Sequence, residues 1–170
     1  MALETLALEK SLVANLGEIK ISRDPEVTIS CLGVGSCIAL CMYDPGTCVG
    51  GVAHIVLPFS TNGTQSKENA TKYADVAIPE LLQRMREQGA VRSRLIVKIA
   101  GGAQMFSPGA SAKGFDTGAR NIEAVKKVLA DEALRIDAED IGGNRGRTVR
   151  LYIATGKVVV RIVGGITKEL

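Results

Sequence analysis

The side chains best suited to covalent chemistry lie close together in this sequence. Four cysteines and the single histidine fall within 24 positions: Cys31, Cys37, Cys41, Cys48 and His54. A free thiol is only a few per cent thiolate at neutral pH, and a neighbouring imidazole activates it by accepting its proton. Any step that needs an imidazole must use His54. The cysteine spacing contains no Cys-x-x-Cys pair and matches no usual zinc pattern, so we expect neither a metal nor another cofactor.

The turn signal at residues 44–47 predicts a hairpin that would bring a cysteine to the histidine. If these four residues form the loop, residue 43 pairs with residue 48 and Cys37 lies directly opposite His54. Directly opposed side chains have Cβ atoms about 4.5–5.5 Å apart. The predicted pair is a thiol nucleophile and its base. A bulge at Gly50-Gly51 would move this register by one residue.

The residues before Cys37 indicate how its thiol could be presented. Gly33 and Gly35 permit a sharp backbone turn, and the N–H groups around Gly35 and Ser36 could form an oxyanion hole. These parts suit acyl transfer through a thioester. The alternative is that the cysteine and the histidine are ordinary core residues. For Cys41 and Cys48 that packing role is the favoured interpretation.

Apolar runs bounded by Gly, Pro and Asp predict the elements that hold this pair. Strands are expected at 18–22, 27–32, 36–43, 49–57, 95–100, 134–138, 148–153 and 157–163. An apolar stripe predicts a first helix that ends at Gly89 and either starts near Ile78 or kinks at Pro79. A second helix is expected with Thr117 as its N-cap. Residues 59–71 are expected to form an exposed loop. The order predicts an α/β chain of the α+β type, with helices packed on mostly antiparallel sheet.

Length and composition fit one ordinary domain. The chain has 170 residues, of which 46% are hydrophobic and 23% charged, with a net charge of +3. We expect an N-terminal lead-in over 1–15, partly mobile, and a single domain over 16–170. The basic residues are dispersed, so charge predicts no nucleic-acid partner. The chain has no run long enough for a membrane-spanning helix and no signal-peptide pattern, which favours a cytoplasmic protein that is not embedded in a membrane.

The blocks CLGVGSC (31–37) and GGVAHIVLP (50–58) closely resemble the CheD family of chemoreceptor glutamine deamidases. Further matching blocks occur at 43–45, 72–75, 98–103, 118–121, 139–147 and 161–165. The resemblance implies hydrolysis of receptor glutamine amides to glutamate and ammonia, and in some members hydrolysis of glutamyl methyl esters. It implies Cys37 as the nucleophile and His54 as the base. Its implied partners are the cytoplasmic helices of methyl-accepting chemoreceptors and a CheC-type phosphatase of CheY. The implied fold has sheet and helix layers and is similar to the catalytic domain of cytotoxic necrotizing factor toxins.

One position departs from the family pattern. The family usually has a threonine as the third catalytic residue, six positions before the nucleophile, and here that position is Cys31. A thiol is a weaker hydrogen-bond partner than a hydroxyl, so we expect Cys31→Thr to raise the rate. Weakened catalysis would favour an alternative function, a regulatory protein that docks to receptor or CheC. A redox thiol protein is a third alternative, but no closely spaced resolving pair supports it.

Two loops are candidate contact surfaces. Met105 and Phe106 lie in a loop with Gly and Pro and could contact a partner, or could be tucked into the core. The glycine-rich segment 142–147 could form a backbone nest for a substrate. A tight connection with solvated arginines is the favoured interpretation of that segment.

Overall fold

The computed structural model describes residues 9–61, 67–106 and 116–170, and their strands form two five-stranded sheets. Sheet A has the order β1-β3-β8-β9-β10, and sheet B has the order β2-β5-β4-β6-β7. The strands of sheet A are β1 (Lys10–Val13), β3 (Val27–Val34), β8 (Arg147–Tyr152), β9 (Val158–Ile162) and β10 (Thr167–Glu169). Those of sheet B are β2 (Ile19–Ser22), β5 (Val49–Ile55), β4 (Ile38–Asp44), β6 (Ile96–Gly101) and β7 (Ala138–Ile141). Among these strands, neighbours run antiparallel except for β1 with β3 and β6 with β7.

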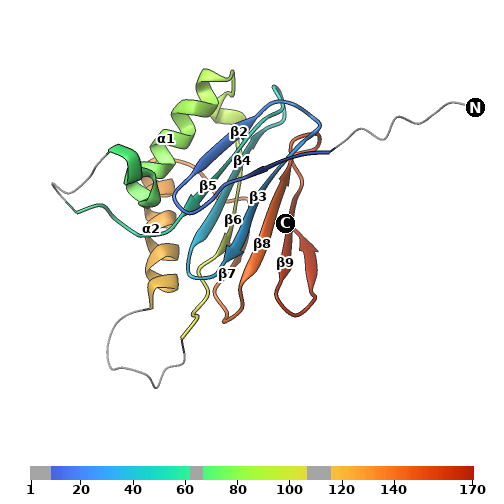
Figure 1. Ribbon diagram of the computed structural model, residues 1–170. Coiled ribbons are helices and arrows are strands. Elements are labelled where there is room, and N and C mark those ends of the chain that lie inside the picture. The colour runs from blue at the N-terminus through green and yellow to red at the C-terminus, as the bar shows by residue number, and fades with distance from the viewer. Residues whose placement is uncertain (1–8, 62–66, 107–115) are drawn as a thin grey trace, which may run out of the picture.

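The elements stack in three layers, as Figure 1 shows. The helices α1 (Ala74–Glu87) and α2 (Thr117–Asp131) lie on one side of sheet B, and sheet A lies on the other side. One apolar core fills the space between the helices and sheet B, and a second core fills the space between the two sheets. Two short 3₁₀ helices, η1 (Lys67–Lys72) and η2 (Arg92–Arg94), precede α1 and β6. The prediction of an α+β fold with mostly antiparallel sheet is confirmed.

The hairpin of β4 and β5 forms the middle of the molecule. Every residue of both strands is buried, because one face of sheet B meets the helices and the other meets sheet A. Strands covered on both faces have continuous apolar sequences in place of an alternating pattern. This explains why the runs at 36–43 and 49–57 are among the clearest strand signals in the sequence.

The start of the first helix and the N-cap of the second differ from those expected. The first starts at Ala74 and continues through Pro79, so the expected start near Ile78 is wrong. Proline removes one N–H bond from a helix, but the buried stripe of this helix offsets that loss. The second starts at Thr117 as expected, but its N-cap is Asp116, whose carboxylate accepts from the N–H of Ala119 at 2.9 Å. Aspartate is at least as good an N-cap as threonine.

The remaining differences concern short strands at sheet edges. The segment 10–13, expected to belong to a lead-in, forms β1 and pairs in parallel with β3. The strand expected at 134–138 lies at 138–141 as β7, and β10 has no counterpart in the prediction. Of the loop expected at 59–71, residues 62–66 lie outside the described residues, and 67–72 form η1. In the described part of the chain, neither helix has the length and apolarity to cross a membrane.

Candidate active site

Cys37 lies in the short connection between the two sheets, directly before β4. Its side chain is 9% exposed, whereas Ile38 and Ala39 beside it are fully buried. Backbone bonds hold this connection to the segment after β6, since the N–H of Gly102 donates to the carbonyl of Cys37 at 2.8 Å. Gly101 has a φ of +125°, and a Cβ there would lie 2.1 Å from the same carbonyl oxygen. Only glycine fits this close approach, which seats the cysteine at the edge of the inter-sheet core.

The register places His54 diagonally across from Cys37, so the predicted direct pairing is wrong. Residue 39 pairs with His54, and residue 44 pairs with 49, because the hairpin loop is 45–48 and not 44–47. Continuing this register puts residue 56 opposite Cys37. The shift is two residues, and side chains alternate faces with a period of two. Cys37 and His54 therefore stay on the same face of sheet B as diagonal neighbours, a separation of about 7–8 Å in a regular sheet.

Asn121 joins the two strands that carry the pair. Its side-chain amide donates to the carbonyl of Ser36 and to the carbonyl of Val56, both at 2.9 Å. Ser36 precedes Cys37, and Val56 follows the strand of His54. Asn121 is fully buried in α2. Its two hydrogen bonds therefore hold the segments that carry the thiol and the imidazole at a fixed spacing from the helix layer. Asn121 was not predicted to have a role. A polar residue among the inward-facing positions of an amphipathic helix was the only feature of the sequence that could have indicated one.

The imidazole of His54 is oriented by a main-chain atom. Its Nδ1 lies 2.9 Å from the carbonyl oxygen of Ala14, and a carbonyl only accepts, so Nδ1 carries the proton. This leaves Nε2 as the basic nitrogen, and among the described residues this buried atom has no hydrogen-bond partner. Two backbone bonds hold the histidine to the same segment: its N–H donates to Glu18 at 3.0 Å, and its carbonyl accepts from Gly17 at 2.9 Å.

Burial acts on both members of the pair. It raises the pKa of the Cys37 thiol above its usual range, and this rise is opposed by the residue's own N–H. It lowers the pKa of His54, against the opposing effect of the bond to Ala14. Both shifts favour the uncharged forms. At rest, the site holds a thiol and a neutral imidazole rather than an ion pair.

The N–H groups before the thiol are available to a ligand. In the described part of the chain, no backbone carbonyl accepts from the N–H of Gly35, Ser36 or Cys37. The carbonyl of Gly35 is used, since it accepts from Ala103 at 2.9 Å and so fixes the loop. Free, fixed N–H groups beside a nucleophile can stabilise a negatively charged oxygen.

Cys31 lies in β3 and is fully buried in the core between the sheets. Its burial raises the pKa of the thiol far above the usual range, with Cys41 and Cys37 as smaller contributions. Nδ1 of His54 donates its hydrogen bond to the carbonyl of Ala14 and not to this thiol. Cys41 is also buried, with its pKa raised to about 12, whereas Cys48 is exposed in the hairpin loop.

A groove of about 780 Å³ adjoins the loop that carries the thiol. It is lined by three segments, represented by Gly35, Met105 and Arg145, and by Val163 from the turn after β9. Main-chain bonds join these segments: Gln104 donates to Gly143 at 2.8 Å and Val163 donates to Gly146 at 2.9 Å. Phe106, at the end of the second segment, is 82% exposed, so it is not tucked into the core.

The two arginines of segment 142–147 differ in exposure. Arg145 is exposed, but Arg147 is buried and donates to Gly142 at 2.7 Å and to Asp140 at 3.3 Å. The expectation that both arginines are solvated is therefore wrong for Arg147. The segment is a tight connection, with positive φ at Gly142 and Gly143 and a buried ion pair beneath it.

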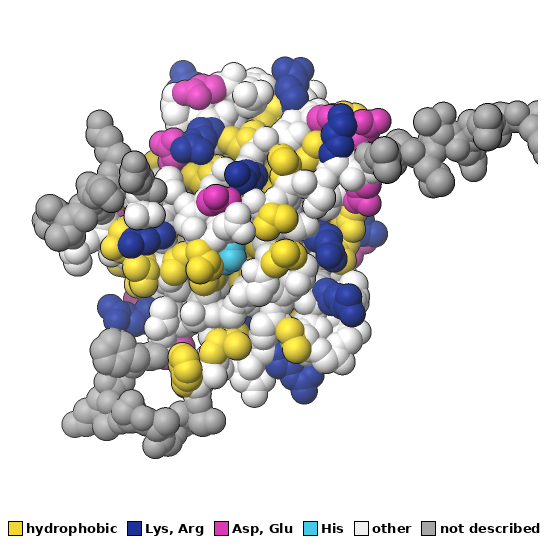
Figure 2. All heavy atoms as spheres, viewed as in Figure 1, with side chains coloured by type: hydrophobic (Ala, Val, Ile, Leu, Met, Phe, Trp, Pro, Cys, Tyr) yellow, Lys and Arg dark blue, Asp and Glu magenta, His cyan; other side chains and the backbone are white. Residues whose placement is uncertain are grey.

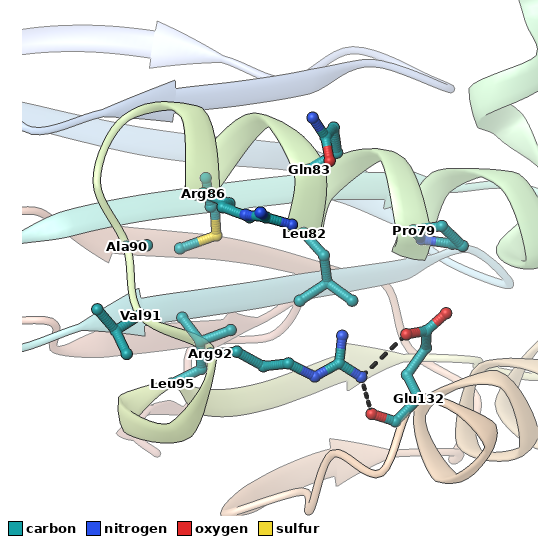
Figure 3. A pocket seen from close by; sticks show the side chains of 10 residues that line it. Pro79, Leu82, Gln83, Arg86, Ala90, Val91, Arg92, Leu95 and Glu132 are labelled. Atoms are coloured by element: carbon teal, nitrogen blue, oxygen red, sulfur yellow. Dashed lines mark hydrogen bonds and ion pairs between the residues drawn. The ribbon is translucent and has the colours of Figure 1, made fainter.

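A second hollow, of about 510 Å³, lies on the helix side of the molecule (Figure 3). Arg86 of α1 borders it, and Arg92 reaches across to the main-chain carbonyl and the carboxylate of Glu132. It contains no nucleophile and no imidazole. The groove next to the loop that carries Cys37 is therefore the better candidate for the active site. Among the described residues, no group of three or more His, Cys, Asp or Glu side chains is arranged to hold a metal ion.

Comparison with known proteins gives one consistent result. Residues 56–162 match the family model described as "CheD chemotactic sensory transduction". The chain is 47% identical over 153 residues to the Thermotoga maritima protein named chemoreceptor glutamine deamidase CheD, covering 90% of this chain and 92% of that protein. It is 44% identical over 155 residues to a probable chemoreceptor glutamine deamidase CheD of Symbiobacterium thermophilum (91% and 94% covered). A Methanococcus maripaludis protein of the same description is 45% identical over 150 residues (88% and 94% covered).

Proposed function

Because this chain belongs to the CheD family, we propose that it is a chemoreceptor glutamine deamidase. It hydrolyses the side-chain amide of particular receptor glutamines to glutamate and ammonia. The observation that carries the proposal is the pairing of Cys37, two residues after the groove residue Gly35, with an imidazole on the same face whose Nε2 has no hydrogen-bond partner among the described residues. We place the reaction on the cytoplasmic helices of the receptor.

The first half of the reaction forms a thioester. Nε2 of His54 accepts the thiol proton of Cys37 as Sγ attacks the amide carbon of the glutamine. The carbonyl oxygen becomes an oxyanion, which the N–H groups of Gly35, Ser36 and Cys37 stabilise. The imidazolium then protonates the amide nitrogen, the C–N bond breaks, and ammonia leaves.

The second half regenerates the enzyme. Nε2 takes a proton from water, the resulting hydroxide attacks the thioester carbon, and the same N–H groups again hold the oxyanion. The C–S bond breaks and the sulfur recovers the proton from the imidazolium. The sum is one water consumed, with one glutamate and one ammonia produced. The neutral resting pair fits this scheme, because the proton moves only when substrate is present.

The same thioester would form from a glutamyl methyl ester. Methanol would then leave in place of ammonia, and the second half of the reaction would be unchanged. Alkoxide is a better leaving group than an amide nitrogen, so a site built for the amide has the chemistry for the ester. Release of methanol from methylated receptor by wild-type protein, and its loss in Cys37→Ala, would support this second activity.

The exposed loop suggests a regulatory interaction beside the chemistry. Phe106 is 82% exposed next to the groove, and large exposed aromatic side chains are common anchors of protein interfaces. We infer that it anchors a protein partner such as a CheC-type phosphatase. Loss of CheC affinity in Phe106→Ala, measured by calorimetry with deamidation retained, is the expected result. Unchanged CheC affinity in Phe106→Ala would contradict this role.

Cys37→Ala tests the proposed activity directly. We expect no deamidation by this variant, because no other thiol lies at the groove, and the matched control Cys48→Ala should keep the wild-type rate. Mass spectrometry of a receptor cytoplasmic fragment resolves each conversion of amide to acid. Deamidation by Cys37→Ala at the wild-type rate would refute the mechanism.

A further inference from the structure

Two arginines lie together on the outer face of sheet A, Arg150 in β8 and Arg161 in β9, and a third, Arg145, lies in the segment before β8. In the part of the chain that the structure describes, none of the three forms an ion pair or a side-chain hydrogen bond. Arg94, Arg135 and Arg147, by contrast, each pair with an aspartate.

The strand register sets the spacing of these cations. Residue 148 pairs with Arg161, and Arg150 pairs with residue 159, so the two arginines are diagonal neighbours on one face. The alternate residues Val149 and Val160 are buried between the sheets, which assigns both arginines to the outer face. Five residues of extended chain separate Arg145 from Arg150, a span of at most about 17 Å.

This basic face is continuous with the groove beside Cys37. Arg145, which precedes β8, lines the groove, and the chain runs from Arg161 directly into the turn at Val163 that forms the groove wall. Figure 2 shows dark blue side chains over β8 and β9, with the magenta acidic side chains mainly toward the upper part of the view. The acidic residues at the edges of sheet A are already engaged, Glu9 with Thr28 and Glu169 with Lys157.

We propose that Arg145, Arg150 and Arg161 dock the acidic side of the substrate helix, so that glutamates near the target glutamine accelerate its deamidation. This inference rests on the proposed function, because the substrate helix is chosen as the partner of this face on the ground that the proposed nucleophile lies nearby. Residues seven and eleven positions from the glutamine lie on its own side of a helix, at about 10 and 16 Å along the axis. Glutamates at these positions would therefore face the same surface of the protein as the target glutamine.

The docking has a consequence for receptors with several target glutamines. Each turnover replaces a neutral amide with a carboxylate on the same helix. The product of one event is then a docking group for the next, so deamidation of neighbouring glutamines proceeds in order, with later events faster than the first. Opposite charges across an interface of this kind raise the association rate and fix the register.

The test uses a receptor cytoplasmic fragment with one target glutamine, made in two forms. The residues seven and eleven positions away are glutamate in one form and glutamine in the other. We expect the glutamate form to have a KM about tenfold lower at low ionic strength, from about two- to fourfold for each exposed charge pair. The difference should disappear at high salt. The triple variant Arg145→Gln, Arg150→Gln, Arg161→Gln should show no preference for the glutamate form. The double variant Arg150→Gln, Arg161→Gln, which leaves the groove lining intact, should lose most of the preference with kcat unchanged. The single variant Arg161→Gln should lose part of the preference for the glutamate form.

Arg86→Gln is the matched control, since it removes one exposed arginine from the helix side of the molecule. It should keep the full preference. Affinities measured with Cys37→Ala separate docking from chemistry. If wild type deamidates both forms with equal KM, docking is refuted and the proposed function stands. If wild type deamidates neither form but Cys37→Ala binds the glutamate form more tightly through the three arginines, docking stands and the proposed function is refuted. Tighter binding of duplex DNA or anionic phosphatidylglycerol vesicles than of the glutamate form would also refute the proposal.

Discussion

Burial moves the pKa of Cys37 and the pKa of His54 apart, and the activity should reflect this. The pKa of His54 is lowered from 6.5 and that of Cys37 is raised from 9.0. The neutral imidazole is the base, so activity is lost only as the pH falls through the lowered pKa of His54. We predict that kcat/KM stays level from about pH 6.5 to 8.5 and declines below that range with an apparent pKa under 6.5.

A pH profile of kcat/KM on a receptor fragment checks this. An acid limb with an apparent pKa above 6.5 would mean that His54 is stabilised as an imidazolium beside a thiolate, contrary to the neutral pair. Titration of the single histidine by NMR gives an independent value on the same sample, without substrate.

The structure leads to a different prediction for position 31, where the family usually has threonine. Cys31 is fully buried, and the carbonyl of Ala14 already holds Nδ1 of His54. We therefore predict that Cys31→Thr changes the deamidation rate by less than about twofold, whereas a lost orienting contact would cost far more. Rates of Cys31→Thr and Cys31→Ala on the same fragment decide it, with the melting temperature of each as the control for packing. A deamidation rate about tenfold higher in Cys31→Thr would show instead that the side chain at position 31 takes part in catalysis.

At this scale, the sequence selected the proposed nucleophile and base but not the groups that hold them in place. The only histidine and the glycine-flanked cysteine were sufficient to select Cys37 and His54, and strand alternation correctly placed them on one face. The register was two residues off, because Asp44 ends β4 and the turn comprises 45–48. Ala14 could not be found, because a main-chain carbonyl leaves no signal in the residue type.

Strand β1 positions the base from the edge of sheet A. The N–H of Lys10 donates to Glu26 and that of Ala14 donates to Ser30, at 2.9 and 2.8 Å. Alternation then directs the N–H of Leu12 toward β3 as well, and that of Ser11 away from it. We predict that Leu12→Pro lowers kcat at least tenfold, because it releases the strand that carries the Ala14 carbonyl.

Ser11→Pro is the control for that substitution, since its N–H points away from the sheet and edge strands tolerate proline at such positions. It should keep most of the activity. Both variants should retain the far-UV circular dichroism of the wild type, because β1 is a short edge strand. Equal rates for the two variants would show that β1 has no part in positioning His54.

The elements most easily predicted were those with the longest apolar patterns. The strands near 27–34, 38–44, 49–55 and 158–162 and both helices were expected in nearly their observed places. The short edge strands β1 and β10 were not, because three or four mostly exposed residues carry no alternation of apolar and polar types. They exist because neighbouring strands offer them unpaired backbone groups, which is a property of the tertiary structure.

At the scale of the whole molecule, Asp44 ties the central hairpin to the segment between α1 and β6. Its fully buried carboxylate accepts two bonds from Arg94 at 2.8 Å, one from the N–H of Val91 at 2.7 Å and one from Gly46 at 2.8 Å. The guanidinium of Arg94 holds the pKa of this carboxyl well below its usual range. We predict that Asp44→Asn lowers the free energy of unfolding by about 3 kcal/mol at neutral pH.

The pH dependence of that effect follows from the lowered pKa. The contribution of Asp44 is complete above its ordinary value of 3.8 and is lost as the pH falls toward the folded value. Urea unfolding of wild type and Asp44→Asn should therefore converge as the pH falls below 4. Asp131→Asn is the control, because its exposed pair with Lys127 should contribute under about 0.5 kcal/mol. If Asp44→Asn lowers the free energy of unfolding no more than this control does, the hydrogen bonds of Asp44 do not stabilise the fold as predicted.

The fold class was within reach of the sequence, but the division into two sheets was not. Pattern and length give strands and helices, whereas β3 leaves its neighbours in sequence and pairs with β8, more than 110 residues away. The arginines at 145, 150 and 161 illustrate the same limit. Their spacing in the chain suggests dispersed charge, and only the antiparallel register of β8 and β9 brings Arg150 and Arg161 onto one face.

The complete burial of β4 and β5 also determines which part of the chain opens last. Amides in strands covered on both faces exchange with solvent only through global unfolding, whereas edge strands and surface loops open locally. Deuterium uptake should therefore be slowest in the hairpin that follows Cys37 and contains His54, and fastest in the edge strand β10. The proposed nucleophile and base are thus attached to the part of the protein that opens last.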